Sequence, residues 1–226
     1  MSPTDLPDLT PSTGIIWAFR FTPDGHGELL RNAALDAAIT SPGDGWIWVH
    51  LGLADMRCRK WIAAHAPVSE FSRELLAGPD EHMRLHILGD EIAGVVPDLR
   101  QDFARPGEEL VRLRFVMTER VLITAPKRPV HAIEINRRAI EASKHFPTAL
   151  AFFDAIIDQF ADTVARIAER LGGELDQAED YLLHDEVYDD RRSLGRVRLQ
   201  AVRMHRQLAQ LRNVFHRVEP QLARMR

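Results

Sequence analysis

The chain has 226 residues, a net charge of −4 and a hydrophobic content of 45%, which are ordinary values for a soluble globular protein. Its single cysteine, Cys58, excludes an internal disulfide and any zinc site built on paired cysteines. No apolar run approaches the ~20 residues that a membrane-spanning helix needs. The proline-rich residues 1–13 do not have the pattern of a secretory signal, and we expect them to be disordered.

Strand-like and helix-like stretches alternate in the first part of the chain. The predicted elements, in chain order, are strands over 14–21 and 45–51, helices over 55–66 and 68–78, hairpins over 84–99 and 110–125, and a helix over 129–142. The second strand has the composition of a buried strand. Ser69 has the side chain of an N-cap, and Gly78 is a stop signal for the helix between them. The pattern predicts an α/β domain with substantial antiparallel pairing.

Beyond Pro147 the sequence predicts helices only. Apolar residues recur at steps of three and four over 153–182 and again over 194–222, which is the spacing of a heptad seam. Gly172 and Gly173 interrupt the first helix, and each costs about 1 kcal/mol relative to alanine. The register continues across them, so we expect a kink there rather than a chain reversal.

The two long helices carry opposite charge. Residues 131–190 contain 14 acids and 5 bases, whereas residues 191–226 contain 10 bases and 1 acid. The sign changes at "DDRRS" (189–193), which predicts the corner of a long antiparallel helical hairpin. We prefer the interpretation in which the acidic and basic helices pair and neutralise each other. The alternative is that each charged face is solvated.

No pattern in the sequence points to an enzyme. A serine elbow, a His-Glu-x-x-His helix and a Cys–His pair are absent, and "DGHG" (24–27) predicts a hairpin turn rather than a phosphate-binding loop. Asp180 and His184 are four residues apart on a predicted helix and share a face, so they are candidate metal ligands. The alternative is a solvated acidic face. His82 and His86 straddle the start of a predicted strand and do not share a helical face.

Arginines along the last helix raise the question of nucleic-acid binding. They are Arg191, Arg192, Arg196, Arg198, Arg203, Arg206 and Arg212. No aromatic residue interleaves with them for base stacking, and the acidic helix of the same chain competes for them. We therefore expect no nucleic-acid partner.

Four motifs in fixed order resemble the CorA family of divalent-cation channels, in its ZntB-like zinc-transporter branch. They are "GWIWVHL" (45–51) followed by a helix, "ELLAGPDEHMRLHILGDEIAGVV" (74–96), "LRFVMTERVLITAPKRPVHAIE" (113–134) and "LRNV" (211–214). The resemblance runs from about Gly14 to Glu219 and covers nearly the whole chain.

The resemblance implies a mixed α/β/α sandwich domain over 14–146, acidic long helices over 147–190 and the basic start of a stalk helix over 191–226. In the family the stalk leads to two transmembrane helices, and members assemble as funnel-shaped homopentamers in the bacterial inner membrane. The Gly-Met-Asn pore signature of the family and both membrane helices are absent. We therefore expect a cytoplasmic fragment that assembles weakly by itself and joins the membrane through the missing helices.

The resemblance also implies a divalent metal ion, Zn²⁺ or Mg²⁺, that is weakly bound and either regulatory or transported. In the family, an acid on the short helix before the central hairpin faces an acid on the neighbouring subunit's stalk, and the ion bridges them. Aligning "ELLAG" places the first acid at Glu74. The alternative is that Glu74 is an ordinary solvent-facing acid near a helix end.

The leading hypothesis is thus the cytoplasmic regulatory and assembly domain of a transporter for divalent metal cations. A free-standing coiled-coil interaction module is the alternative. The downstream reading frame distinguishes them, because two apolar stretches with Gly-Met-Asn beyond Arg226 support the transporter and a stop codon there contradicts it.

Overall fold

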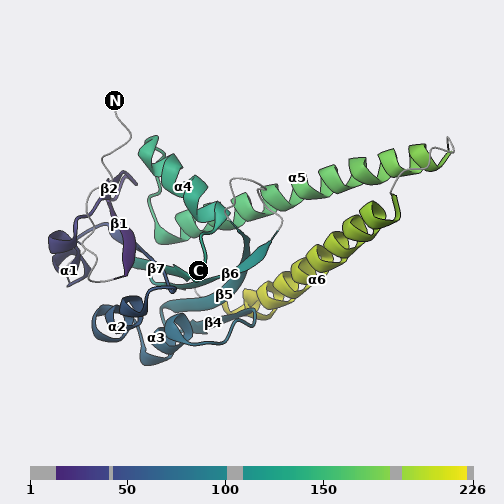
Figure 1. Ribbon diagram of the computed structural model, residues 1–226. Helices are drawn as coiled ribbons and strands as arrows, with labels where there is room; N and C mark the ends of the chain where they lie inside the picture. The colour runs from purple at the N-terminus through teal and green to yellow at the C-terminus, as the bar shows by residue number, and fades with distance from the viewer. Residues whose placement is uncertain (1–13, 41–42, 101–108, 184–189, 223–226) are drawn as a thin grey trace.

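A seven-stranded sheet lies at the centre of the computed structural model, which describes residues 14–40, 43–100, 109–183 and 190–222 (Figure 1). The strand order is β2-β1-β3-β7-β6-β5-β4. The strands are β1 (Ile15–Phe21), β2 (Gly27–Leu29), β3 (Trp46–Leu51), β4 (Arg84–Leu88), β5 (Glu91–Leu99), β6 (Leu110–Met117) and β7 (Val121–Pro126). The helices are α1 (Asn32–Thr40), α2 (Met56–His65), α3 (Glu70–Ala77), α4 (His131–Glu141), α5 (Ala149–Leu183) and α6 (Asp190–Leu222).

Antiparallel hairpins build most of the sheet. β4 pairs with β5, β5 with β6, and β6 with β7, all antiparallel. β1 pairs antiparallel with both β2 and β3, so β3–β7 is the one parallel pair among the described strands. The two predicted hairpins and the turn at 24–27 are therefore confirmed. The short strand β2 and the helix α1 were not expected.

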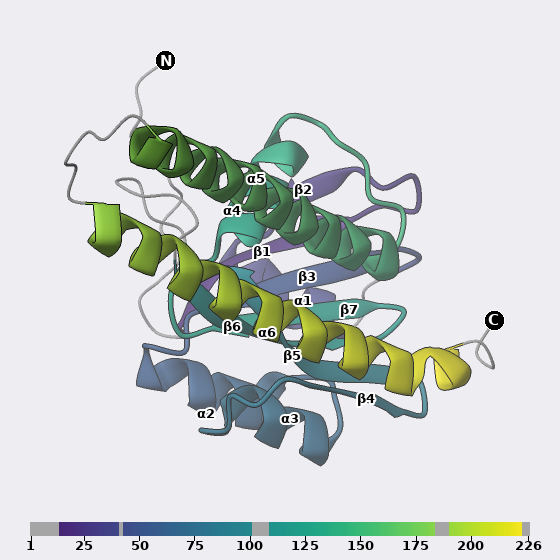
Figure 2. The same ribbon diagram turned by 90° about the vertical axis from the view of Figure 1, so that its right-hand side faces the viewer.

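Helices cover both faces of the sheet (Figure 2). On one face α1, α2 and α3 pack against side chains that include Ile47 and Val49. On the other face α4 and the start of α5 pack against Trp46 and Trp48. Successive side chains of a strand point to opposite faces, so β3 contributes to both cores. All six residues of β3 are buried, as its composition predicted.

Aromatic side chains hold the start of α5 on the sheet. Phe152 of α5 lies 4.6 Å from Trp48 and 5.7 Å from Trp46, measured between ring centroids. Phe21 stacks on Trp46 at 4.0 Å, and the indole N–H of Trp46 donates to the carbonyl oxygen of Phe146 at 2.9 Å. Such rings bury large apolar areas, so the direction in which α5 leaves the sheet is firmly set.

Side-chain caps start α2 and α3 on the first face. Asp55 accepts a hydrogen bond from the Arg57 N–H at the start of α2, and Ser69 accepts one from the Ser72 N–H at the start of α3. The hydroxyls of Ser69 and Ser72 each donate to a carboxylate oxygen of Glu91 at 2.6 Å. These bonds tie α3 to β5 and confirm Ser69 as an N-cap.

The lone cysteine lies in the core of the same face. Cys58, in the first turn of α2, has no exposed surface. Burial raises the pKa of its thiol to about 12. The thiol is therefore protonated and shielded in the folded chain.

Two long helices extend from the sheet, and α6 returns antiparallel to α5 (Figures 1 and 2). One cluster joins them to the sheet: Leu99, Phe160, Val164, Ile167, Leu171, Val197 and Met204. α5 continues through Gly172 and Gly173, so the chain does not reverse there, as predicted.

The described contact between α5 and α6 is apolar. From Asp158 to Asp176 no carboxylate of α5 forms an ion pair with a described residue of α6, and Glu174 pairs with Arg170 of its own helix. The expected charge pairing is therefore wrong over this stretch. Apolar residues occupy the facing positions and leave the charges on the outer flanks. The side chains of 178–193, around the sign change, lie outside the described part of the structure.

Candidate functional site

Glu74, the predicted metal ligand, lies on the exposed side of α3. It lines a groove of about 650 Å³ between α2, α3 and β4, together with Arg59, Asp80, Arg84 and other residues. Its carboxylate forms no ion pair with another described residue. The group is therefore available to a cation or to a partner.

Asp80, the other carboxylate of this groove, already has partners. It accepts from the His82 N–H at 3.0 Å, from His82 Nδ1 at 2.6 Å and from Arg84 at 2.5 Å. The hydrogen bond from the His82 backbone is the largest cause that lowers the pKa of Asp80 to about 2. Asp80 is therefore ionised at neutral pH, and its charge is already compensated within the chain.

The two histidines near the groove have different neighbours. His82 is exposed and contacts Asp80, whereas His86 of β4 packs edge-on against Phe71 of α3, with 5.1 Å between ring centroids. Burial, and then the charge of Arg84, lower the pKa of His86. His86 lies in β4 and His82 precedes that strand, so the two do not share a helical face, as expected.

The groove does not hold a metal ion by itself. Among the described residues, no three His, Cys, Asp or Glu side chains gather as metal ligands would. The guanidinium groups of Arg59 and Arg84 line the same groove and repel a cation. A single free carboxylate at Glu74 falls short of the six or more oxygen ligands that hard dications take.

The second predicted metal pair falls largely outside the described residues. Asp180 belongs to α5, but its side chain is not described, and His184 lies outside the described residues altogether. The pair therefore stays a prediction.

A buried arginine lies beside Asp80 and was not anticipated from the sequence. Arg114 of β6 has no exposed surface, and its Nη2 donates to the Asp80 carbonyl oxygen at 3.2 Å. The same nitrogen lies 3.9 Å from the Glu81 carboxylate, while Nε and Nη1 have no hydrogen-bond partner among the described residues. Burial lowers the pKa of Arg114. An arginine inside the apolar strand "LVRLRFVM" is the signal that could have indicated it.

A family comparison covers most of the chain. Residues 43–225 match the family described as "CorA-like Mg2+ transporter protein". The chain is 26% identical over 209 residues to the zinc transport protein ZntB of Cronobacter sakazakii, covering 92% of this chain and 61% of that protein. It is 24% identical over 200 residues to ZntB of Klebsiella pneumoniae, covering 88% of this chain and 60% of that protein.

Solved structures show the same fold at low sequence identity. Full-length CmaX superposes with a TM-score of 0.82 at 22% identity, covering 92% of this chain and 64% of the other. The CorA magnesium transporter of Methanocaldococcus jannaschii superposes with a TM-score of 0.69 at 17% identity, covering 89% of this chain and 62% of that chain. The ZntB cytoplasmic domain of Vibrio parahaemolyticus superposes with a TM-score of 0.57 at 14% identity, covering 94% of this chain and 99% of that chain.

The chain therefore spans about three-fifths of the length of the curated relatives that it matches. Within the described residues, no helix combines the length and the apolar composition that crossing a bilayer requires.

Proposed function

Because residues 43–225 match its profile, the chain belongs to the CorA-like Mg²⁺ transporter family, and we propose that it forms the cytoplasmic part of a divalent-cation transporter. In this role the chain does not conduct ions; it assembles the cytoplasmic funnel and senses ions. The family match is the observation that carries the proposal. The sheet topology and the two long helices are consistent with it.

In the proposed assembly, α6 is the beginning of the stalk that leads to the bacterial inner membrane. Five copies surround the transport axis, as the resemblance to the family implies, and a head-to-tail contact that closes on itself gives such a ring. Support comes from the length of α6, which spans Asp190–Leu222, runs antiparallel to α5 and returns to the β4–β5 side of the sheet (Figure 1).

The proposed cargo is Zn²⁺ or Mg²⁺. The curated relatives named zinc transport proteins favour Zn²⁺, and the description of the family favours Mg²⁺. The test is flux of each ion into liposomes that contain the full-length protein and an ion-sensitive dye. We expect saturable uptake of at least one of the two, and uptake of neither would contradict the transport proposal.

The proposed regulatory site is Glu74 together with an acid of the neighbouring subunit's stalk. The single chain offers one free carboxylate, while Asp80 already pairs with Arg84, so a second carboxylate from another chain is needed to favour a dication beside Arg59. A bridging dication then favours the arrangement of subunits in which the two acids face each other.

The test of this site is metal-dependent protection of the full-length protein from proteolysis. We expect Glu74→Ala to raise several-fold the metal concentration that gives half-maximal protection. Glu70→Ala is the matched control, since Glu70 is also an exposed acid of α3 but does not line the groove. Equal protection in both variants would remove Glu74 from the site.

Exposed apolar residues on α6 favour the second candidate, a free-standing helical interaction module. Leu199 and Val202 are 51% and 49% exposed. In the transporter these residues contact neighbouring copies, whereas in a module they contact a different helix. The oligomeric state of the chain separates the two roles.

A further inference from the structure

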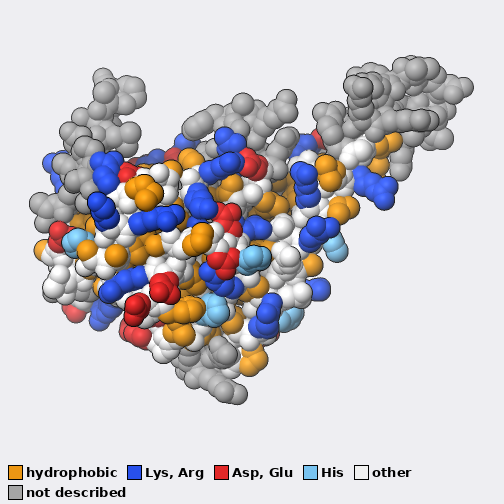
Figure 3. Space-filling view, turned by 60° about the horizontal axis from the view of Figure 1, so that its bottom comes forward, with side chains coloured by type: hydrophobic (Ala, Val, Ile, Leu, Met, Phe, Trp, Pro, Cys, Tyr) orange, Lys and Arg blue, Asp and Glu red, His pale blue; other side chains and the backbone are white. Residues whose placement is uncertain are grey.

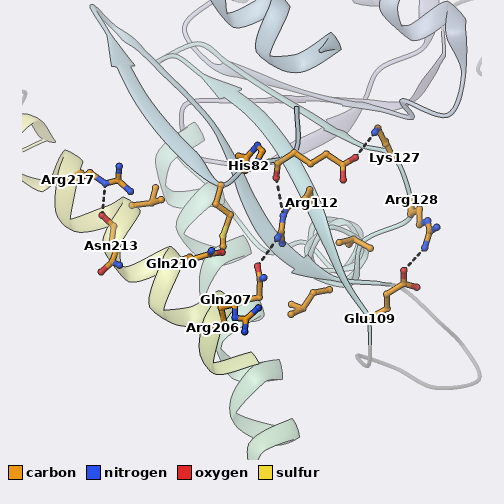
Figure 4. A pocket seen from close by; sticks show the side chains of 15 residues that line it. His82, Glu109, Arg112, Lys127, Arg128, Arg206, Gln207, Gln210, Asn213 and Arg217 are labelled. Atoms are coloured by element: carbon orange, nitrogen blue, oxygen red, sulfur yellow. Dashed lines mark hydrogen bonds and ion pairs between the residues drawn. The ribbon is translucent and has the colours of Figure 1, made fainter. Parts of the chain in front are cut away.

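A second groove, of about 940 Å³, lies between α6 and the end of the sheet (Figure 4). Its walls come from the segment before β4, the start of β6, the residues after β7 and one face of α6. None of its lining residues belongs to the Glu74 groove.

Positive charge dominates the lining of this groove. Five Lys or Arg side chains face two carboxylates, Glu81 and Glu109; the cations are Arg112, Lys127, Arg128, Arg206 and Arg217. Both carboxylates have partners already: Lys127 lies 2.5 Å from Glu81, and Arg128 lies 2.5 Å from Glu109. Glu109 also pairs with Arg100 at 2.8 Å. Arg206 and Arg217 form no ion pair with a described carboxylate of the groove, and Arg112 shares Glu81 with Lys127.

Arg112 is the most confined of these cations. It donates to the Glu81 carbonyl oxygen at 3.2 Å and to the Gln207 side-chain oxygen at 2.8 Å, and neither acceptor carries a charge. Burial lowers the pKa of Arg112. The nearby Glu81 carboxylate offsets this charge only in part, because it also pairs with Lys127 and lies near Arg114. A bound anion would compensate the partly buried guanidinium further.

One face of α6 contributes a row of polar groups to the groove. They are Arg206, Gln207, Gln210, Asn213 and Arg217, spaced so that all lie on one side of the helix. Arg206 and Arg217 are separated by roughly 16 Å along the helix, at ~1.5 Å per residue. Arg203 lines an adjoining groove of about 620 Å³ that shares Arg112 and Arg206, so the positive surface continues along α6. Figure 3 shows Lys, Arg and His side chains along the projecting helices.

We propose that this groove binds a short linear polyphosphate, either free or as the phosphate chain of a nucleotide. Guanidinium groups bind phosphate oxygens in a bidentate manner, and Arg206 and Arg217 are too far apart along α6 to share one carboxylate or chloride ion. Among the described residues that line the groove there is no Phe, Tyr or Trp, so it lacks the large aromatic rings on which a base stacks most strongly. The groove therefore recognises the phosphate chain, and ATP and tripolyphosphate should bind with similar affinity.

The experiment is calorimetric titration of the chain with tripolyphosphate and with ATP, in buffer with a chelator. The variant Arg206→Gln/Arg217→Gln removes two groove cations from exposed positions on α6. The matched control Arg198→Gln/Arg212→Gln removes the same charge from exposed positions of α6 outside the groove. We expect the groove variant to bind at least tenfold more weakly and the control to stay within about twofold of the original chain. If both double variants unfold at the same midpoint temperature as the original chain, their fold is intact.

Three results would overturn the proposal. An equal loss of affinity in both double variants would indicate only general attraction to a basic helix. The original chain could bind phosphatidylglycerol vesicles but not tripolyphosphate, and the groove variant could lose the vesicle binding. That result would assign the groove to a lipid headgroup. The original chain could self-associate without binding tripolyphosphate, and only the groove variant could lose that association. That result would assign the groove to an acidic surface of a second copy.

Discussion

Asp98 is a buried carboxyl group at the end of β5 that the proposed function does not use. It is 2% exposed, and its side chain accepts a hydrogen bond from the Leu99 N–H at 2.6 Å. Burial raises the pKa of Asp98 to about 7, although the N–H groups of Leu99 and Ala132 lower it in part. The folded chain therefore holds a proton at Asp98 in mildly acidic solution, where an unfolded chain would have lost it.

We expect Asp98 to make the chain less stable as pH rises. Between its ordinary pKa of 3.8 and about 7, the folded state binds more protons at this site than the unfolded state does. The free energy of unfolding therefore falls by up to about 1.4 kcal/mol per pH unit across that window and levels off above it. In urea titrations from pH 4 to pH 8, Asp98→Asn should remove this contribution relative to the original chain. Identical pH profiles for the two proteins would show that Asp98 does not hold its proton.

Arg114 is a buried charge that we expect to contribute little to stability. It has no exposed surface, and two of its nitrogens lack partners among the described residues. Its nearest carboxylate, Glu81, is half exposed and pairs with Lys127, so it keeps a partner when the arginine is removed. We expect Arg114→Met to change the free energy of unfolding by less than about 1 kcal/mol, or to increase it.

The control for this substitution is Arg112→Met in the same strand. It removes hydrogen bonds to Gln207 and to the Glu81 carbonyl oxygen, so it should cost about 1–2 kcal/mol. A loss greater than about 3 kcal/mol in Arg114→Met, measured by urea unfolding, would mean that its bond to Asp80 is indispensable.

At the scale of elements, two glycines weaken α5. Gly172 and Gly173 are exposed, and a Cβ at either position would meet nothing within 4 Å. Alanine there restricts the unfolded chain and leaves every contact in place. We expect each Gly→Ala substitution to stabilise the chain by up to about 1 kcal/mol in chemical unfolding.

The contrasting substitution is Gly45→Ala. A Cβ at Gly45 would lie 1.8 Å from the carbonyl oxygen of Phe21, so this change should destabilise the chain. If Gly172→Ala also destabilises, the helix needs its glycines for a bend or for a contact with another chain.

The sequence predicted the elements whose signals are local. Hairpins with polar tips, the cap at Ser69 and the buried strand at 46–51 follow from residue spacing and composition, and the structure confirms them. The strand β2 has three residues, too few for a period-2 pattern to be recognised. Over Asp158–Asp176 the predicted charge pairing of the long helices was wrong, because opposite net charge does not say which faces meet. The spacing of the apolar residues along each helix determines which faces meet.

The candidate site was less predictable than the fold. Glu74 came from a family resemblance, and its exposure agrees with that role without testing it. The cations near it and those of the α6 groove come from segments far apart in the sequence, such as Arg59, Arg112 and Arg206. Only the packing of α6 against the sheet brings the second set together, and no spacing rule indicates such a contact.

At the scale of the whole molecule, we expect the chain to associate weakly. In the proposed pentamer the pore shares the contacts between subunits, so the chain alone assembles only at high concentration. Sedimentation velocity should show a monomer at micromolar concentration and, on concentration, a cyclic oligomer. A tight dimer at micromolar concentration would favour the helical interaction module instead.

Because Cys58 is buried, its reaction with thiol reagents can be used to detect local unfolding of the chain. Cys58 is the one thiol in 226 residues, and in the folded state it is shielded and protonated. A thiol reagent at neutral pH reacts only when α2 separates from the sheet, so the labelling rate measures that separation directly. A cysteine introduced on the surface of α6 or near Glu74 would react far faster and could be tagged selectively with a fluorophore, without first replacing the native residue.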